Sequence, residues 1–533
     1  IGPLNPVDHD LVFESFSPSG YGSPAPVELV ISAEKKERFI EIVRGLLPGY
    51  EPCFQVAQEE MSVAAIAKDI LEELGASPNL REELSRVFAF EKRHRSLAAF
   101  LESSEGARKL YQGEPLAKRA LHSAYALHGK LCRFTNDSSR LVIVPGALEG
   151  FYSVSVVPGG ERFAQLSASA VERSGGWAIG VQHSHFLSAL ERTVESLRGE
   201  EEMPPALNLF AGSEKTRWAP GTLDDPRAFA LIAEGDTAGV YLLESQGIRD
   251  HLVAIKPSSF DELVNIISLY RPGPMEGRLW QKYLSNLEKK GKAMLAHPLL
   301  APVLAGTQGV LLYREQIREV LDDAAGLAGE DEVRVERALE RGDSGDLVSA
   351  RLVFIRGAMD GGLDEEEGQR IFDYLLHNAA FTHSKSLSCA QASLSYRTAF
   401  FKAHCFEWYF TALLNSNMGV KDRETRYLEY LEKKGTQVLP HGINADGVAF
   451  EYEDGVIRAP LTAVVALEKG EWEAIVEERI YRGDFASFED FLERMANRFS
   501  LRAVVALVDK GVFDDSGASR DRLRSVGESF FRR

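Results

Sequence analysis

Residues 235–248 read GDTAGVYLLESQGI, and residues 269–275 read LYRPGPM. In the second run, two prolines fix the backbone dihedral φ and the glycine between them permits a tight bend. The sequence therefore predicts a rigid loop that carries Arg271 at its entrance. A guanidinium is planar and permanently charged, and it suits a phosphate group. A surface turn is the common alternative for such a composition.

The order of these residues resembles the fingers region of the C-family replicative polymerases, the bacterial DNA polymerase III alpha subunits. The family pattern reads roughly E-T-x-G-V-F-Q-L-E-S-x-G-M, followed by a helix that ends in A-L-Y-R-P-G-P-M. The resemblance implies an α/β multidomain fold with a polymerase-β-like nucleotidyltransferase palm, a helical thumb, helical fingers and a helix-hairpin-helix C-terminal domain. It places the palm at residues 1–33 and 131–230, the thumb at 34–130, the fingers at 231–435 and a degenerate helix-hairpin-helix domain at 436–533.

The composition is that of an ordinary soluble protein, with 44% hydrophobic and 26% charged residues among 533. No run of about 20 apolar residues predicts a membrane span, and the start of the chain has no signal-peptide pattern. The four cysteines are widely spaced, so neither zinc nor a disulfide framework is expected, which suits the cytoplasm. The net charge of −18 argues against nonspecific nucleic-acid binding by the whole surface but leaves room for a local basic channel. Because the first residue is Ile1, further residues upstream are compatible with the sequence.

The expected palm lacks the carboxylates that nucleotidyl transfer uses to hold two Mg²⁺ ions. The family reads P-D-I-D-I-D-F where this chain has Pro26 to Ser32, and its aspartates fall on Val27, Leu29 and Ile31. Glu28 is one position out of register and is expected to point to the opposite face of the strand.

A second palm segment has lost its acid as well. The family's V-K-F-D-F-L-G-L is matched by Trp177 to Gln182, where its aspartate falls on Gly180. No acid occurs between Arg173 and Leu190, so a small error of register does not restore one. We therefore expect no catalytic carboxylate and no metal ligand at Val27, Leu29 or Gly180.

Several binding residues follow from the resemblance. It assigns nucleotide binding to Arg271, Lys385, Ser245 and Gln246, and DNA binding to Tyr313, Gln316 and Arg341. Tyr313 is equally compatible with a place in the core.

The family motifs around these residues are altered in places. The family's Y-Q-E-Q reads Tyr313 to Gln316, with Arg314 in place of the first glutamine. Its F-N-K-S-H reads His383 to Leu387, so Lys385 is kept and the histidine is lost. The hairpin pattern G-L-x-A-I-K-G-V-G reads Pro460 to Gly470, with Glu468 facing the place of a phosphate, which weakens the prediction of DNA binding there.

Three functions remain open from the sequence. The first is a catalytically silent polymerase III alpha-like protein of DNA replication or repair that handles primer-template DNA or supports an active polymerase or other subunits. The second is an active DNA-directed DNA polymerase, and the third is a protein-interaction scaffold without DNA binding. No cofactor is expected in the first case, and Mg²⁺ is expected in the second.

Overall fold

In the computed structural model, placement is described for residues 27–60, 62–89, 96–127, 130–146, 153–156, 162–165, 170–171, 175–197, 223–289, 297–341, 344–445, 447–461, 469–495 and 497–532. The chain divides into two compact units. The sheet unit comprises residues 22–31 and 36–183, and the helical unit comprises residues 1–21, 32–35 and 184–533. No helix among the described residues is long and apolar enough to cross a membrane.

The sheet unit is built on a six-stranded sheet in the order β1-β6-β3-β2-β5-β4. Its long strands pair antiparallel, with Cys53 of β2 opposite Val142 of β3, and Leu141 of β3 opposite Ile179 of β6. The strands are β1 (Val27–Ser32), β2 (Tyr50–Glu60), β3 (Leu131–Pro145), β4 (Val154–Val156), β5 (Arg162–Ala164) and β6 (Trp177–Ser184).

The two faces of this sheet are covered differently. Helix α1 (Lys36–Leu46) packs Phe39, Ile40 and Val43 against one face. That face also carries Ile31 of β1 and, in β6, both Ile179 and Val181. Because side chains alternate along a strand, Val27 and Leu29 share the face of Ile31. The opposite face holds a smaller apolar cluster around Cys53, Val142 and Val144, with Ala178 beside it.

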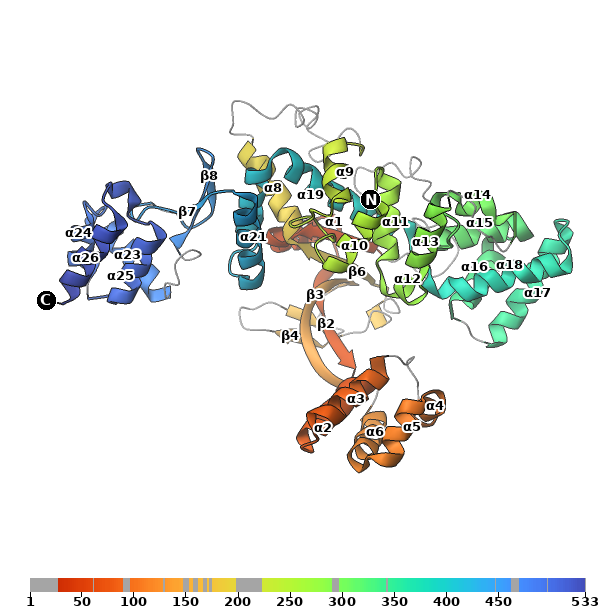
Figure 1. Ribbon diagram of the computed structural model, residues 1–533. Helices are drawn as coiled ribbons and strands as arrows, with labels where there is room; N and C mark the ends of the chain where they lie inside the picture. Colours follow the sequence, from red (N-terminus) through yellow and green to blue (C-terminus); the bar gives the residue numbers. More distant parts are fainter. Residues whose placement is uncertain are drawn as a thin grey trace. The chain divides into compact units, whose positions relative to one another are not determined.

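The ribbon of β2 and β3 leads from the sheet to a cluster of helices with its own core (Figure 1). These helices are α2 (Val63–Glu73), α3 (Pro78–Ala89), α4 (Leu97–Ser103), α5 (Glu105–Gly113) and α6 (Pro115–Leu127). The apolar periodicity of residues 59–74 predicts one helix, and this prediction is wrong at the start of the segment. Glu59 and Glu60 end β2, and the helix begins at Val63 after the N-cap Ser62. Long-range pairing with β3 overrides local helical periodicity here.

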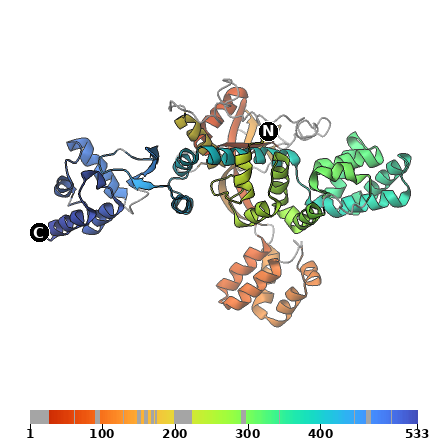
Figure 2. The same ribbon diagram turned by 45° about the horizontal axis from the view of Figure 1, so that its top comes forward.

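Helix α19 (Lys385–His404) is the centre of the helical unit, and it packs against α9 (Pro226–Ala233), α11 (Phe260–Leu269) and α20 (Phe406–Asn415) (Figure 2). Helices α14 to α18 enclose a separate apolar core around Phe354, Phe372 and Leu375. The other helices of this unit before residue 435 are α8 (His185–Leu197), α10 (Gln246–Ile255), α12 (Pro272–Glu276), α13 (Leu279–Glu288), α14 (Leu300–Leu304), α15 (Arg314–Ala325), α16 (Gly329–Arg341), α17 (Ser344–Asp360), α18 (Glu365–Asn378) and α21 (Lys421–Lys434).

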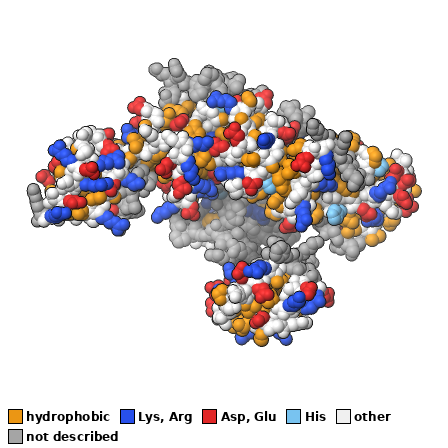
Figure 3. Space-filling view, in the orientation of Figure 1, with side chains coloured by type: hydrophobic (Ala, Val, Ile, Leu, Met, Phe, Trp, Pro, Cys, Tyr) orange, Lys and Arg blue, Asp and Glu red, His pale blue; other side chains and the backbone are white. Residues whose placement is uncertain are grey.

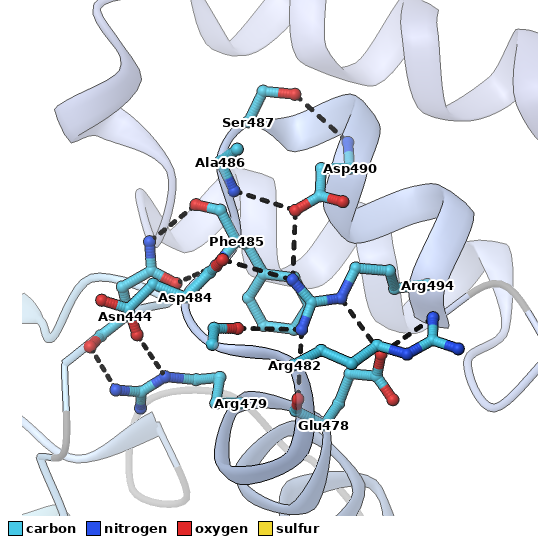
Figure 4. Close-up of polar contacts among 11 residues, drawn as sticks. Asn444, Glu478, Arg479, Arg482, Asp484, Phe485, Ala486, Ser487, Asp490 and Arg494 are labelled. Atoms are coloured by element: carbon cyan, nitrogen blue, oxygen red, sulfur yellow. Dashed lines mark hydrogen bonds and ion pairs between the residues drawn. The ribbon is translucent and has the colours of Figure 1, made fainter.

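The described residues of the C-terminal part form a three-stranded sheet, β7 (Val438–Pro440), β9 (Val456–Ala459) and β8 (Glu451–Glu453), and several helices. The helices are α23 (Lys469–Arg482), α24 (Phe488–Met495), α25 (Leu501–Lys510) and α26 (Arg520–Phe531). Arg494 fixes the turn between α23 and α24, because its guanidinium meets Glu478 at 3.0 Å and Asp490 at 3.2 Å and lies over the ring of Phe485 (Figure 4). On the visible surface of these helices, basic and acidic side chains are interspersed (Figure 3).

Candidate functional site

The loop 235–245 is fastened to α19 and α20 by buried polar contacts. Lys402 has a fully buried side chain, and its ammonium donates hydrogen bonds to the carbonyl oxygens of Asp236 at 2.5 Å and Ala238 at 2.9 Å. The Tyr409 hydroxyl donates to the carbonyl of Gly239 at 2.6 Å. Burial lowers the pKa of Lys402 to about 8, while the nearby carboxylate of Asp236 opposes that shift. The glycine-containing run therefore has one fixed conformation.

This loop places Ser245 and Gln246 at the start of α10. Ser245 is the N-cap, and both side chains are exposed. The Ser245 hydroxyl lies 3.2 Å from the hydroxyl of Tyr270, the residue before Arg271. A Cβ added to Gly247 would collide with that same tyrosine hydroxyl. Gly247 therefore permits the close approach that brings the two quoted runs together.

Arg271 is the N-cap of α12, where the Arg-Pro-Gly-Pro run forms a helical turn rather than an extended loop. Its guanidinium donates a hydrogen bond to the side-chain oxygen of Gln391 in α19. A second link ties the preceding helix, α11, to α19, where the hydroxyls of Ser268 and Ser388 lie 2.7 Å apart. The predicted nucleotide-binding residues Arg271 and Lys385 are thus carried by two elements, α12 and α19, that are bonded to each other.

The amino end of α19 is already capped by a carboxylate. Glu315, which is 3% exposed, accepts hydrogen bonds from the backbone N–H of Lys385 at 3.0 Å and 3.1 Å. It also lies 3.4 Å from the hydroxyls of Ser384 and of Ser386. The helix end is therefore occupied, and a ligand phosphate would have to be held by cationic side chains. Glu315 is not among the residues predicted from the sequence, and its only signal there is its place inside the Y-Q-E-Q match.

His383 and Arg314 lie side by side next to this helix end. The Arg314 backbone N–H donates to the carbonyl of His383 at 3.1 Å, and the His383 N–H donates to the carbonyl of Leu312 at 2.9 Å. Burial, together with the positive charges of Arg271 and Arg314, lowers the pKa of His383 to about 4. The imidazole is therefore neutral at physiological pH, and the two guanidinium groups lie close enough to act on it.

The structure argues against two of the predicted DNA contacts. Tyr313 is 2% exposed and donates its hydroxyl to Asn265 at 2.6 Å. Gln316 is 6% exposed, and its amide bonds to the backbone N–H of Leu312 and Tyr313 and to the carbonyl of Val303. Both side chains hold the core in place, and neither has a polar group left to reach DNA. The Arg341 side chain lies outside the described residues.

The direction of the Glu28 side chain contradicts one expectation from the sequence. Glu28 shares its face of the sheet with Gly180, because a Cβ added to Gly180 would lie 3.0–3.3 Å from the Glu28 carboxylate. Val27 and Leu29 lie on the other face, which α1 covers. The expectation that Glu28 points away from this site is therefore wrong, since Glu28 shares a face with Gly180 and Val27 and Leu29 do not. The packing of Ile31 against α1 sets this alternation, and the sequence pattern alone did not reveal it.

A positively charged side chain, that of Arg140, lies on the same face of the sheet. Arg140 of β3 is the direct cross-strand partner of Gly180 in β6, and direct partners project to the same side of a sheet. The exposed face thus presents Glu28, Gly180 and Arg140 across β1, β6 and β3. Among the residues with described placement, no three His, Cys, Asp or Glu side chains gather into a group able to hold a metal ion.

The predicted degenerate hairpin cannot be evaluated from the described residues, since positions 462–468, including Glu468, lie outside them. Helix α23 begins at Lys469, and Leu461 is buried in the core of the C-terminal part.

Comparison with known proteins gives matches along most of the chain. A model described as the bacterial DNA polymerase III alpha NTPase domain matches residues 1–175, and one described as the bacterial DNA polymerase III alpha subunit finger domain matches residues 203–362. A model of the helix-hairpin-helix motif matches residues 435–523.

Curated relatives give the same picture. The DNA polymerase III subunit alpha of Halalkalibacterium halodurans is 25% identical over 531 residues, which cover 99% of this chain and 46% of the relative. The subunit of the same name from Staphylococcus aureus strain Mu50 is 31% identical over 302 residues, which cover 56% of this chain and 28% of the relative. The chain thus spans about half the length of the first relative.

Proposed function

We propose that this chain, which belongs to the family of bacterial DNA polymerase III alpha subunits, is a DNA-handling member of that family whose palm does not support nucleotidyl transfer. The family was predicted from the fingers motifs, and that prediction is confirmed. The mixed α/β, mostly helical fold with finger and helix-hairpin-helix domains is confirmed as well. The absence of catalysis and the DNA-handling role are our proposals.

The observation that carries this proposal is the pairing of Gly180 with Arg140 on the face where the Glu28 carboxylate lies. In nucleotidyl transfer a primer hydroxyl attacks the α-phosphate of a nucleotide and pyrophosphate leaves, with two magnesium ions holding the attacking and leaving oxygens. Magnesium takes oxygen ligands at fixed octahedral positions. One carboxylate beside a glycine and an arginine does not fit such a pair of ions, and the positive charge of Arg140 opposes their binding.

The fingers support the DNA-handling part of the proposal. Ser245, Arg271 and Lys385 keep the family's residue types, and the described contacts join their elements into one corner. Such a corner can bind a nucleotide or a DNA phosphate even when no chemistry follows. We propose primer-template DNA as the ligand of the whole protein, and replication or repair subunits as its partners.

Primer extension by the intact purified protein tests the proposal. We expect no templated incorporation with Mg²⁺ or Mn²⁺, while primer-template DNA binds with an affinity that falls as salt rises. Templated incorporation that is lost in Arg271→Ala would overturn the catalytic part. Absence of binding even at low salt would instead favour a protein-interaction scaffold.

An active polymerase remains the second candidate, and Glu28 is the specific observation in its favour. This residue supplies one carboxylate on the face that also carries position 180. If Glu28 served catalysis, Glu28→Gln would abolish incorporation and Glu41→Gln, an exposed change on α1, would not. The same pair of variants therefore separates the two candidates in one assay.

A further inference from the structure

An exposed apolar stripe runs along one side of α17, at the edge of the group of helices α14 to α18 (Figure 1). The other side of this helix packs Phe354 into the core of the group. On the stripe, Val348 is 64% exposed, Leu352 67% and Met359 51%. Ile355 completes the row and is half-buried, because it packs against Gly368 of α18. Single exposed apolar side chains are common, but a continuous row of them marks an interaction surface.

The spacing of the α17 stripe is symmetric along the helix. Its members are separated by four, three and four residues, which is the spacing of a seam between two packed helices. The midpoint of this pattern lies between positions 353 and 354. A twofold axis through the midpoint and perpendicular to α17 would place Val348 of one copy against Met359 of the other. The same axis would place Leu352 against Ile355. The stripe is therefore complementary to itself, as an interface between two identical copies requires.

The positive charges beside the stripe are compatible with this pairing. Arg356 lies on one flank, where the twofold axis would place it opposite Ser349 of the second copy. Arg351 lies on the other flank, where its guanidinium bonds to Asp373 of α18 at 2.5 Å. The axis would place Arg351 opposite Ala358 of the second copy. Arginine therefore does not meet arginine across the stripe.

The negative charges favour the antiparallel orientation over the parallel one. Exposed carboxylates gather at the carboxyl end of α17 and the start of α18, on Asp360, Glu365 and Glu366. In an antiparallel pair they approach the amino half of the second α17, with its Arg351 and the positive end of its helix dipole. The acid of that half, Asp346, is two residues from Val348 and so points away from the stripe. In a parallel pair these carboxylates would meet each other and Arg351 would meet Arg356, and like charges repel.

We propose that the α17 stripe is a docking surface for a second copy of this chain, with the two α17 helices antiparallel. A second copy accounts for the symmetric spacing, which the helix of a different protein would not require. Pairing removes the apolar row of both copies from water, and that burial drives the association. Because one helix seam is a small interface, we expect a dissociation constant of about 1–100 µM. The inference goes beyond the proposed function, since neither the palm nor DNA takes part in it.

Sedimentation equilibrium of the intact protein tests this surface. We expect the parent to form a dimer as its concentration rises, and Leu352→Asp to weaken that dimer about tenfold or more, because pairing would bury a carboxylate on each copy. Val348→Glu changes a different turn of the stripe and should act in the same direction. Both side chains are exposed, so the melting temperature should stay close to that of the parent. Ile480→Asp, on a side chain of α23 that is 76% exposed, is the matched control and should dimerise as the parent does.

Disulfide crosslinking tests the orientation. Under copper-catalysed oxidation, Val348→Cys and Met359→Cys should form a crosslinked dimer when the two variants are mixed, and neither should do so alone. Crosslinking of each variant alone but not in the mixture would indicate parallel helices and would overturn the proposal. A parent that stays monomeric up to about 100 µM would overturn it too, and would leave the stripe to a different protein. Equal weakening of the dimer by Leu352→Asp and Ile480→Asp would also contradict the assignment to α17.

Discussion

The fingers residues around Arg271 and the palm residues around Gly180 differ in the contacts that hold them in place. In the fingers, the loop before Ser245 is tied to α19 by Lys402, and Gly247 packs on Tyr270, the neighbour of Arg271. In the palm, α1 and the sheet fill one face with apolar side chains. Glu28 and Gly180 lie on the other face. Packing therefore constrains the fingers residues directly, whereas the exposed side chains of Glu28 and Arg140 can change without disturbing the apolar clusters of the sheet.

The largest effect is expected where the fingers loop is fastened. Lys402→Met keeps the volume but leaves the carbonyl groups of Asp236 and Ala238 without their donor, and should lower the free energy of unfolding by about 2–4 kcal/mol. Chemical denaturation measures this loss. Lys433→Met, an exposed change on α21, is the control and should stay within about 0.5 kcal/mol of the parent. Equal losses in the two variants would show that the buried contacts are unimportant.

The next effect concerns the close approach of α10 to Tyr270. Gly247→Ala should destabilise the protein by about 1–3 kcal/mol, because the new methyl group meets the tyrosine hydroxyl. Tyr270→Phe removes that hydroxyl, so the double variant should recover part of the loss. A double-mutant cycle from thermal unfolding measures this coupling, and strictly additive losses would contradict the contact.

A smaller effect should depend on pH. The pKa of His383 is lowered from 6.5 to about 4 in the folded chain. The unfolded chain therefore binds a proton between these values that the folded chain does not, and stability falls as pH is lowered through this window. Above pH 6.5 this contribution is constant. His383→Phe should lose less melting temperature between pH 6.5 and 4 than the parent, and identical slopes would contradict the burial of this imidazole.

The smallest effect is expected in the palm. Gly180→Ala places a methyl group 3.0–3.3 Å from the exposed end of the Glu28 side chain, which can move aside. We expect a change in unfolding free energy below about 0.5 kcal/mol, in contrast to the same substitution at Gly247. Thermal unfolding of the two alanine variants side by side measures the contrast between the regions. A large loss at Gly180 would mean that the palm face is structurally constrained as well.

Long ordered motifs made the family and the fingers predictable from the sequence. The runs at 235–248 and 269–275 contain glycines and prolines, and few backbone conformations suit them in this arrangement. The order of the residues in these runs identified the family. The apolar pattern of the sequence also predicts helices at residues 261–270 and 406–414, and these are present as α11 and α20.

The errors arose where partners distant in sequence decide the outcome. Residues 50–60 become a strand because β3 pairs with them, and no local periodicity carries that information. The face on which Glu28 lies depends on Ile31 packing against α1. A short match to P-D-I-D-I-D-F does not contain that information, so the sequence placed Glu28 on the wrong face. Likewise, Tyr313 and Gln316 match a motif, yet their bonds to Asn265 and Val303 place them in the core.

Manganese binding to the palm tests the central claim most directly. Electron paramagnetic resonance titration of the intact chain counts bound Mn²⁺, and Glu28→Gln removes the carboxylate that lies beside Gly180. We expect the same Mn²⁺-binding isotherm for the parent and for Glu28→Gln. We expect an added Mn²⁺ site in Gly180→Asp, where two carboxylates meet. A site in the parent chain that Glu28→Gln abolishes would contradict it.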